Sequence, residues 1–303
     1  MKVAVTGASG FVGRRLLSRL FDNDTVRVFT RTAQAAAATR FPTGAKAVEW
    51  DPVLGPPPAG SLDDVDAIVH LAGESVGQRW SRAVKTRIRD SRILGTMNLV
   101  SGIAQARVKP RVLVSASAIG FYGPRGDEAL DETAAAGSDF LADVCAAWEK
   151  EGARAETFGS RSVLLRIGIV LGAGGGALAR MLLPFRLGVG GPLGSGKQWM
   201  SWIHLDDLVS LILLALRTES LRGPVNATAP EPVTNKEFSR TLGRVLRRPA
   251  FLPTPGFPLR LLLGEFADVL LTGQRVLPRK AEAAGLQFRF PQLEPALRDI
   301  LVR

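Results

Sequence analysis

Three glycines near the start of the chain have the spacing and surroundings of a phosphate-binding turn. Residues 2–6 form a short apolar, β-branched run that predicts a buried strand. Gly7, Gly10 and Gly13 follow, and a helical pattern begins directly after them. Such a turn points backbone N–H groups and the positive end of a helix dipole at an anion. The pattern therefore predicts a dinucleotide-phosphate site, with an ordinary turn between a strand and a helix as the alternative.

The residue after the second predicted strand indicates which dinucleotide would bind. Residues 25–30 predict that strand, and Arg31 follows it with no aspartate or glutamate beside it. An acidic residue here would accept hydrogen bonds from a ribose 2′-OH, whereas an arginine can pair with a 2′-phosphate. We therefore expect NADP(H), contacted by Thr30 and Arg31. The alternative is a solvated arginine at the end of a strand.

Further apolar runs predict the elements that position these residues. They predict strands at 45–50, 66–72, 111–117 and 162–171, and helices at 33–38, 80–106, 139–155 and 205–217. Alternating strands and helices imply an α/β fold with a Rossmann-type, doubly wound parallel sheet. We place this dinucleotide domain at residues 1–171, with some later segments returning to it. A smaller mixed α/β substrate lobe is expected at residues 172–303.

Composition narrows the classes of function. Cys145 is the only cysteine, so no intramolecular disulfide forms, and with two histidines no metal site is expected. The net charge of +11 comes from scattered arginines, so we expect a small-molecule substrate and no nucleic acid. The longest apolar run, residues 208–216, is too short to span a bilayer, so no membrane partner is expected. The chain opens on a strand without a leader-like segment, which favours a cytoplasmic location.

Several longer motifs resemble the extended short-chain dehydrogenase/reductase superfamily. TGASGFVG resembles its cofactor turn, DAIVHLAG its fourth strand, LVSASAIGFYG its fifth strand with the catalytic serine, and SWIHLDDLV the entry to the substrate lobe. SRILGT, FLADVCAAWE and GGPLGSGKQWMSWIH are similar to an atypical NAD-dependent epimerase/dehydratase-like group, also described as sugar-nucleotide epimerases. The tail GQRVLPRKAEAAGLQFRFPQLEPAL resembles its C-terminal domain of unknown function, expected from about residue 249.

The resemblance implies a set of cofactor contacts beyond the first turn. It implies that Arg92, which replaces the usual asparagine, lines the cofactor pocket with Leu71, Ala72 and Val170. Together with the turn residues and the end of the 66–72 strand, the expected cofactor contacts are Gly7, Ser9, Gly10, Phe11, Val12, Gly13, Thr30, Arg31, Leu71, Ala72, Gly73, Arg92 and Val170.

The sequence departs from this superfamily in its proton-transfer residues. The superfamily uses a tyrosine with a lysine four residues later, but residues 139–149 contain neither. Ser117 matches the superfamily serine that hydrogen-bonds the substrate, with Ser115 as the other register. Tyr122, the only tyrosine, could donate a proton from the turn after this strand, or be a packed ring with a satisfied hydroxyl.

Other polar and aromatic residues are expected at the substrate pocket. Glu74 lies at the mouth of the cleft, and it or Glu149 could act as a base or as an ion-pair partner. Trp202 and His204 could line the pocket or pack the lobe. Two functions follow: an NADP(H)-dependent oxidoreductase or epimerase-like enzyme on a small carbonyl or hydroxyl substrate, or a redox-inactive NADP(H)-binding sensor or scaffold. A homodimer is compatible with either.

Overall fold

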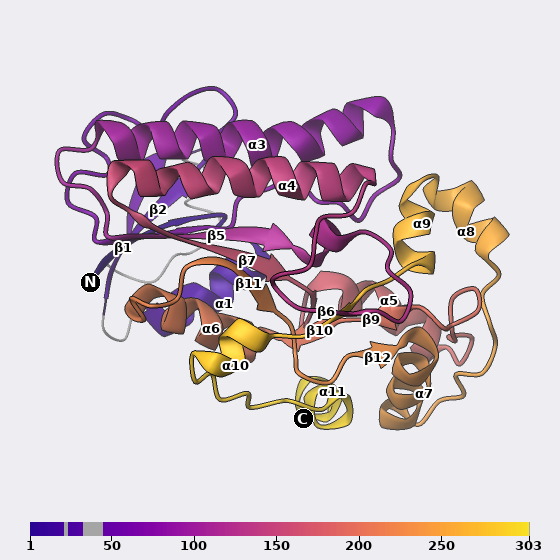
Figure 1. Cartoon of the computed structure of the whole chain (residues 1–303). Helices are drawn as coiled ribbons and strands as arrows, with labels where there is room; N and C mark the ends of the chain where they lie inside the picture. The colour runs from indigo at the N-terminus through magenta and orange to yellow at the C-terminus, as the bar shows by residue number, and fades with distance from the viewer. Residues whose placement is uncertain (21–23, 33–44, 303) are drawn as a thin grey trace.

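The computed structural model describes residues 1–20, 24–32 and 45–302. The helix expected at residues 33–38 lies outside these ranges. Figure 1 shows a central sheet with helices on both of its faces and an additional lobe beside it. The described strands of the sheet run in the order β11-β7-β5-β4-β1-β2-β3, and all neighbours are parallel. This confirms the predicted Rossmann-type α/β fold.

Six of the seven described strands of the central sheet fall within or beside predicted apolar runs, whereas β11 was not predicted. Their bounds are β1 (Lys2–Thr6), β2 (Thr25–Thr30), β3 (Lys46–Glu49), β4 (Ala67–His70), β5 (Val112–Ala118), β7 (Arg161–Ile167) and β11 (Gly223–Ala227). β1 lies between β2 and β4, so the winding of the sheet reverses beside β1. Ligands of such sheets bind at this reversal, outside the carboxyl ends of the strands.

Each face of the sheet packs against its own pair of helices. α1 (Phe11–Leu20) and α6 (Leu205–Arg217) cover one face, and α3 (Arg82–Gln105) and α4 (Phe140–Ala153) cover the other (Figure 1). The β1 side chains alternate accordingly: Val3 and Val5 belong to the core cluster beneath α1 and α6, whereas Ala4 packs into the cluster beneath α3. Continuous burial of the strand explains its unbroken apolar sequence.

The structure divides the strand predicted at residues 162–171 into two strands. β7 ends at Ile167, and β8 (Ile169–Leu171) leaves the sheet to pair with β10 (Trp202–His204). The Gly168 N–H still donates to the Ala227 carbonyl (3.1 Å), but the Ile169 N–H donates to the Ser201 carbonyl (2.9 Å). A Cβ at Gly168 would lie 2.5 Å from the Ser201 oxygen, so the crossing point requires glycine.

The lobe is built from short paired strands and, in the described part of the chain, six helices. Its strand pairs are β8 with β10, β9 (Trp199–Met200) with β12 (Val233–Thr234), and β13 (Arg275–Val276) with β6 (Ala129–Leu130). Its helices are α5 (Gly176–Arg186), α7 (Asn235–Leu246), α8 (Gly256–Leu263), α9 (Phe266–Leu271), α10 (Arg279–Ala283) and α11 (Leu293–Leu301). The short turns η1 (Ile119–Tyr122) and η2 (Arg154–Phe158) follow β5 and α4.

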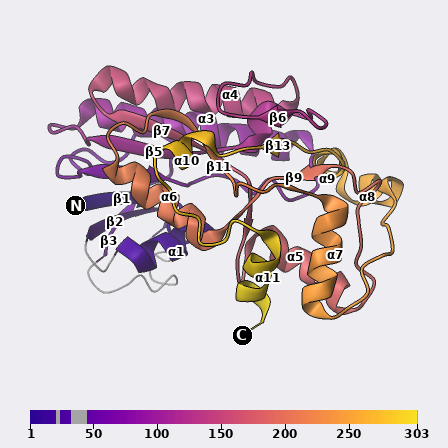
Figure 2. The same cartoon turned by 60° about the horizontal axis from the view of Figure 1, so that its bottom comes forward.

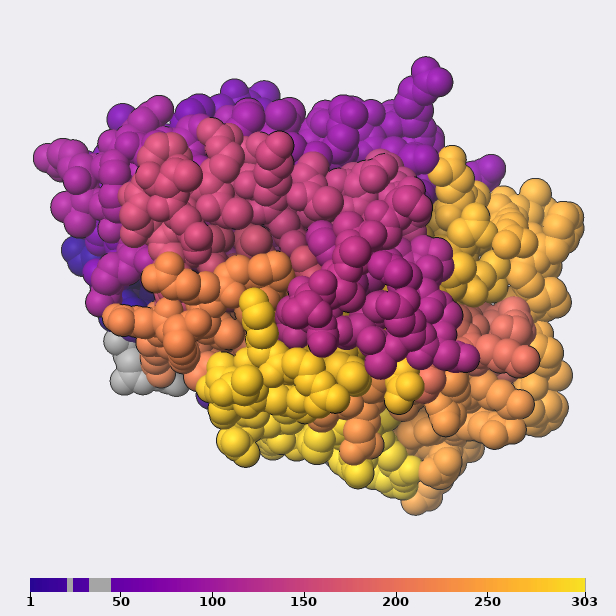
Figure 3. Space-filling model, in the orientation of Figure 1, coloured from indigo at the N-terminus to yellow at the C-terminus, as the bar shows by residue number. Residues whose placement is uncertain are grey.

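The C-terminal part of the lobe is docked beside the segment that follows β5. Figure 2 shows α11 and α7 on the side of the sheet opposite α3, and Figure 3 shows the yellow C-terminal segment against the magenta one. The lobe has its own apolar core, which includes Trp202, Phe238 and Phe290. No helix in the described ranges is long and apolar enough to cross a membrane.

His70 is a core residue of β4. Its ring is fully buried, with Nδ1 2.7 Å from the Thr6 hydroxyl and Nε2 3.1 Å from the Thr96 hydroxyl. The Trp148 indole N–H also donates to Thr96 Oγ1 (2.8 Å). Burial lowers the pKa of His70 from 6.5 to about 4. The neutral ring therefore links β1, β4, α3 and α4, as expected for a packing histidine.

We predict that Gly13→Ala destabilises the fold. A Cβ at Gly13 would overlap the Gly7 carbonyl oxygen and lie 2.7 Å from Ala8 Cα, so α1 would have to move away from β1. The expected loss is about 1–3 kcal/mol in the free energy of unfolding, measured with urea. Gly55→Ala is the control, because a Cβ there meets nothing within 4 Å. Equal stability of the two variants would contradict the packing argument.

We also predict a specific pH dependence from His70. Because its pKa of about 4 in the folded protein lies below the ordinary 6.5, the unfolded chain binds the proton first as the pH falls. The stabilisation is complete above about pH 6.5 and is lost towards about pH 4, about 3 kcal/mol in total. Urea unfolding across this range should show a shallower pH slope for His70→Gln than for the parent chain. Parallel slopes would refute the assignment.

Candidate functional site

The glycine turn after β1 has the geometry of an anion cradle. Gly7 has φ +68°, and a Cβ there would lie 2.7 Å from the Leu71 carbonyl carbon, so this position requires glycine. The Gly10 N–H donates to the Gly7 carbonyl (3.0 Å), and α1 begins at Phe11. Ser9 and Gly10 are exposed. The first N–H groups of α1 have no partner within the helix, so the turn offers donors to a phosphate.

The ring of Phe11 is covered by the glycine-rich loop after β8. A Cβ at Gly172 would lie 2.9 Å from Phe11 Cζ, and one at Gly175 would lie 2.5 Å from Cδ2. Val170 stands in β8 just before this loop and is half-buried. The loop therefore packs against the phosphate turn and brings Val170 towards that turn. This close packing explains why the loop is rich in glycine.

The ends of β2 and β4 lie on either side of the turn. Thr30 is the last residue of β2, the strand that pairs with β1. The exposed Arg31 follows directly after it. On the other side, the Thr6 hydroxyl accepts hydrogen bonds from the Leu71 and Ala72 N–H groups (3.2 Å each). These positions agree with a dinucleotide that extends across the carboxyl ends of the strands.

Arg92 holds the loop that follows β4. Its guanidinium donates to the Glu74 carbonyl (3.0 Å) and the Ile88 carbonyl (3.1 Å), and it lies over the Trp148 ring at 5.1 Å. A Cβ at Gly73 would lie 3.4 Å from Arg92 Cζ. Burial lowers the pKa of Arg92. Arg92 thus fixes the backbone of residues 73 and 74.

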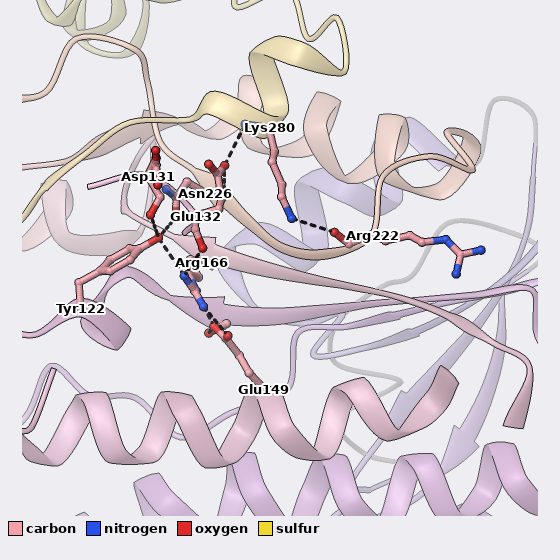
Figure 4. A network of polar contacts seen from close by, with 9 residues as sticks. Tyr122, Asp131, Glu132, Glu149, Arg166, Arg222, Asn226 and Lys280 are labelled. Atoms are coloured by element: carbon pink, nitrogen blue, oxygen red, sulfur yellow. Dashed lines mark hydrogen bonds and ion pairs between the residues drawn. The ribbon is translucent and has the colours of Figure 1, made fainter. Parts of the chain in front are cut away.

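Ser117 contacts a buried ion pair between Glu149 and Arg166, which belongs to the network of polar contacts that Figure 4 shows. Its hydroxyl donates to Glu149 Oε1 at 2.6 Å. Arg166 of β7 donates to both carboxylate oxygens, from Nε to Oε1 at 2.9 Å and from Nη2 to Oε2 at 2.8 Å. All three residues are buried. Burial opposes the charge of Arg166, but its bonds to Glu149 outweigh this and raise its pKa.

Tyr122 is on the far side of the same network. Its side chain is fully buried, and its hydroxyl lies 2.7 Å from Asn226 Oδ1 and 2.9 Å from the Asp131 carbonyl oxygen. The hydroxyl also accepts from Arg166 Nη1 (3.0 Å), and burial raises its pKa. This arrangement matches the packed-ring alternative, in which protein groups satisfy the hydroxyl.

Helix α4 presents apolar groups to Gly120. Leu141 Cβ and Cys145 Sγ lie 3.3 Å and 3.9 Å from the position of a Cβ on Gly120. Cys145 is buried, and burial raises its pKa to about 12, so the thiol stays protonated and unreactive. The described residues hold no group of three or more His, Cys, Asp or Glu side chains that could bind a metal ion.

Trp202 and His204 are buried in the lobe, which agrees with the packing alternative for both residues. Trp202 is fully buried, and its indole N–H donates to the Glu231 carbonyl (3.1 Å). His204 caps α6, because its Nδ1 accepts from the Asp206 N–H (3.1 Å), and its ring packs on Phe290 at 4.0 Å. Burial lowers the pKa of His204.

Four residues of the network, Glu132, Arg166, Asn226 and Lys280, were not predicted from the sequence. Glu132 Oε1 accepts from the Asn226 N–H (3.0 Å) and from the Lys280 N–H (3.0 Å), and Arg166 joins them to Glu149 (Figure 4). The one available signal was Arg166 itself, a charge within the otherwise apolar run of residues 162–171. A charge in a buried strand requires a partner, although the sequence does not say which.

Comparison with known families agrees with this geometry. The model of the "NAD dependent epimerase/dehydratase family" matches residues 3–227, and a "domain of unknown function (DUF1731)" matches residues 254–300. The chain is 45% identical to the chloroplastic epimerase family protein SDR39U1 homolog of Arabidopsis thaliana, over 99% of this chain and 87% of the relative. It is 42% identical to an epimerase family protein of Mycobacterium leprae, over 97% of this chain and 94% of that protein.

Solved structures show the same fold. Human epimerase family protein SDR39U1, crystallised with NADPH, is 34% identical, with a TM-score of 0.85 and 99% of both chains covered. UDP-glucuronic acid 4-epimerase from Bacillus cereus, at 19% identity and a TM-score of 0.79 over 99% of this chain and 98% of that one, shares the fold alone. The glycine turn, the sheet order and these matches together show that the chain belongs to the NAD-dependent epimerase/dehydratase family, with a C-terminal DUF1731 domain.

Proposed function

We propose that this protein is an NADP(H)-dependent oxidoreductase or epimerase-like enzyme that acts on a small carbonyl or hydroxyl substrate. The observation that carries the proposal is the glycine turn after β1, where a Cβ on Gly7 would meet the backbone of Leu71 and where α1 begins. This turn lies at the reversal of the sheet, where dinucleotides bind. A bound nicotinamide would supply or accept a hydride. The protein's own residues must bind the dinucleotide and exchange a proton with the substrate.

Arg31 supports the choice of NADP(H) over NAD(H). It is exposed at the carboxyl end of β2, next to the phosphate turn, and no carboxylate replaces it at this strand end. A guanidinium there can pair with a 2′-phosphate. The NADPH crystallised with the human relative is consistent with this choice.

Ser117 is the residue best placed to exchange a proton with the substrate. Its hydroxyl proton is directed at Glu149 Oε1, 2.6 Å away, so the Ser117 oxygen is left as an acceptor. In alcohol oxidation, the substrate hydroxyl would give its proton to Ser117 Oγ as the Ser117 proton passes to Glu149. In carbonyl reduction, Glu149 would return a proton to Ser117 Oγ as the Ser117 proton passes to the substrate. Arg166 holds the carboxylate in place through both of its oxygens.

The second candidate function is a redox-inactive NADP(H)-binding sensor or scaffold. It is favoured by the apolar pair Leu141 and Cys145, which face Gly120 from α4 in place of a proton donor. Hydride transfer to a carbonyl is slow without a placed donor. A cytoplasmic location and a homodimer stay predictions from the sequence; the plant relative is named chloroplastic.

We predict that Arg31→Ala weakens NADPH binding about ten- to a hundredfold, because a charge-assisted contact contributes about 1.5–3 kcal/mol. Binding of NADH should stay weak and unchanged. The measurement is a fluorescence titration with both dinucleotides. Arg19→Ala, an exposed arginine in the last turn of α1, removes the same charge and should have no such effect. Equal affinities for NADPH and NADH in the parent protein would exclude the proposed role of Arg31.

We predict opposite behaviour for Ser117→Ala and Tyr122→Phe. Ser117→Ala should lower NADPH oxidation by small aldehydes, ketones and quinones about 10²–10⁴-fold, because it removes the proton-exchanging group. Tyr122→Phe should preserve the rate but lower the free energy of unfolding by about 1–3 kcal/mol, because Arg166 and Asn226 lose a buried partner. The readouts are single-turnover NADPH oxidation and urea unfolding.

The outcomes separate the two candidate functions. Loss of the reaction in folded Tyr122→Phe with a normal rate in Ser117→Ala would assign the proton to Tyr122 instead. Tight NADPH binding without oxidation by any of these carbonyl compounds would favour the sensor or scaffold.

A further inference from the structure

Large apolar side chains are exposed together at the outer end of the lobe. Eight such residues are between 49% and 77% exposed. They form what we call the lobe-end patch: Leu183, Leu187, Val189, Phe251, Leu252, Phe257, Leu261 and Leu262. No residue of α8 is buried, although this helix is mostly leucine, phenylalanine and proline. Exposed apolar patches of this kind mark interaction surfaces.

Three pieces of chain bring these residues to one place. The Thr254 N–H donates to the Pro192 carbonyl and the Gly194 N–H to the Thr254 carbonyl, both at 2.8 Å. A Cβ at Gly188 would lie 3.4 Å from the Pro249 ring. The segment after α5 therefore lies along residues 249–254, and α8 follows directly. Figures 1 and 2 both place α8 at the end of the molecule away from the N-terminus.

The charged side chains in the chain segments that form the lobe-end patch are all positive. Residues 157–205 and 238–264 contain no aspartate or glutamate. Arg186, Arg247, Arg248 and Arg260 are exposed within these segments. Arg260 donates to Asp268 of the neighbouring α9 (3.0 Å). An apolar centre with a cationic rim is complementary to an anionic lipid surface, where leucine and phenylalanine enter the boundary of the acyl chains and arginines meet headgroups.

We propose that the lobe-end patch docks this protein on the surface of anionic membranes. A second copy of the chain fits this face less well, because a two-fold contact would place each rim of arginines against the same rim of the partner. Docking of this kind requires no spanning helix. The sequence analysis expected no membrane partner because the apolar runs are too short to span a bilayer. Binding to a membrane surface does not depend on the length of such runs.

Flotation of the full-length protein with vesicles tests the proposal. The protein should float with vesicles of phosphatidylcholine plus phosphatidylglycerol at low ionic strength, much less at high salt, and not with phosphatidylcholine alone. Phe257→Ser combined with Leu261→Ser should abolish flotation. Arg186→Gln combined with Arg248→Gln should weaken it roughly fivefold for each arginine. Leu54→Ser with Val108→Ser is the matched control, because these side chains are also exposed (86% and 66%) but lie outside the patch.

A fluorescent label provides a second measurement that keeps the apolar patch almost intact. Cys145 is the only cysteine and is 3% exposed, so an environment-sensitive dye attached through Leu261→Cys labels one site. Its emission should shift to the blue with the anionic vesicles, whereas a dye attached through Leu54→Cys should not respond. Circular dichroism melting confirms that each variant is folded.

Three results would overturn the proposal. The first is no flotation of the parent protein with anionic vesicles, and the second is flotation without a response from the label at position 261. The third is a stable dimer in analytical ultracentrifugation that Phe257→Ser with Leu261→Ser converts to monomer, which would make the patch a contact between copies.

Discussion

The buried ion pair between Glu149 and Arg166 is the interaction on which the surrounding structure depends. Two charges removed from water cost several kcal/mol each, so they are tolerated only when hydrogen bonds complete their surroundings. Glu149 comes from α4 and Arg166 from β7, and Ser117 of β5 and Tyr122 of η1 supply the remaining partners. Four elements are therefore held in one relative arrangement at the carboxyl end of the sheet.

The same network extends to the C-terminal domain through backbone groups. Glu132 accepts from the Asn226 and Lys280 N–H groups, and the Asn226 amide donates to the Leu277 carbonyl (2.9 Å). β13 adds a two-residue parallel pairing with β6. The bond from the Asn226 N–H is buried and the other two are partly buried, so losing the buried bond leaves an unpaired polar group without water. These bonds thereby hold the short segment that contains β13 beside the sheet. Without them, a larger apolar contact would be needed to hold it there.

Local features of the sequence predicted the sheet and the phosphate turn well. β1 and β2 have the predicted bounds, because both are short segments rich in β-branched residues with clear ends. The glycine spacing identified the turn because Gly7 and Gly13 are constrained by neighbours within a few residues or on the adjacent strand. The Ser117 network and the buried positions of Trp202 and His204 were not predictable in this way. Their partners come from residues dozens of positions away, and a sequence does not show which distant residues meet.

The path of the chain at Gly168 has a consequence for synthesis of the protein. β7 is the outer strand of the sheet until β11 (Gly223–Ala227) is made, and residues 168–222 are synthesised in between. During that interval a nascent chain has an apolar strand with one row of unpaired N–H and C=O groups, a geometry that pairs readily with other strands. Productive folding therefore depends on residues 223–227 reaching β7 before another chain does, and early translational arrest within this interval would yield an aggregation-prone fragment.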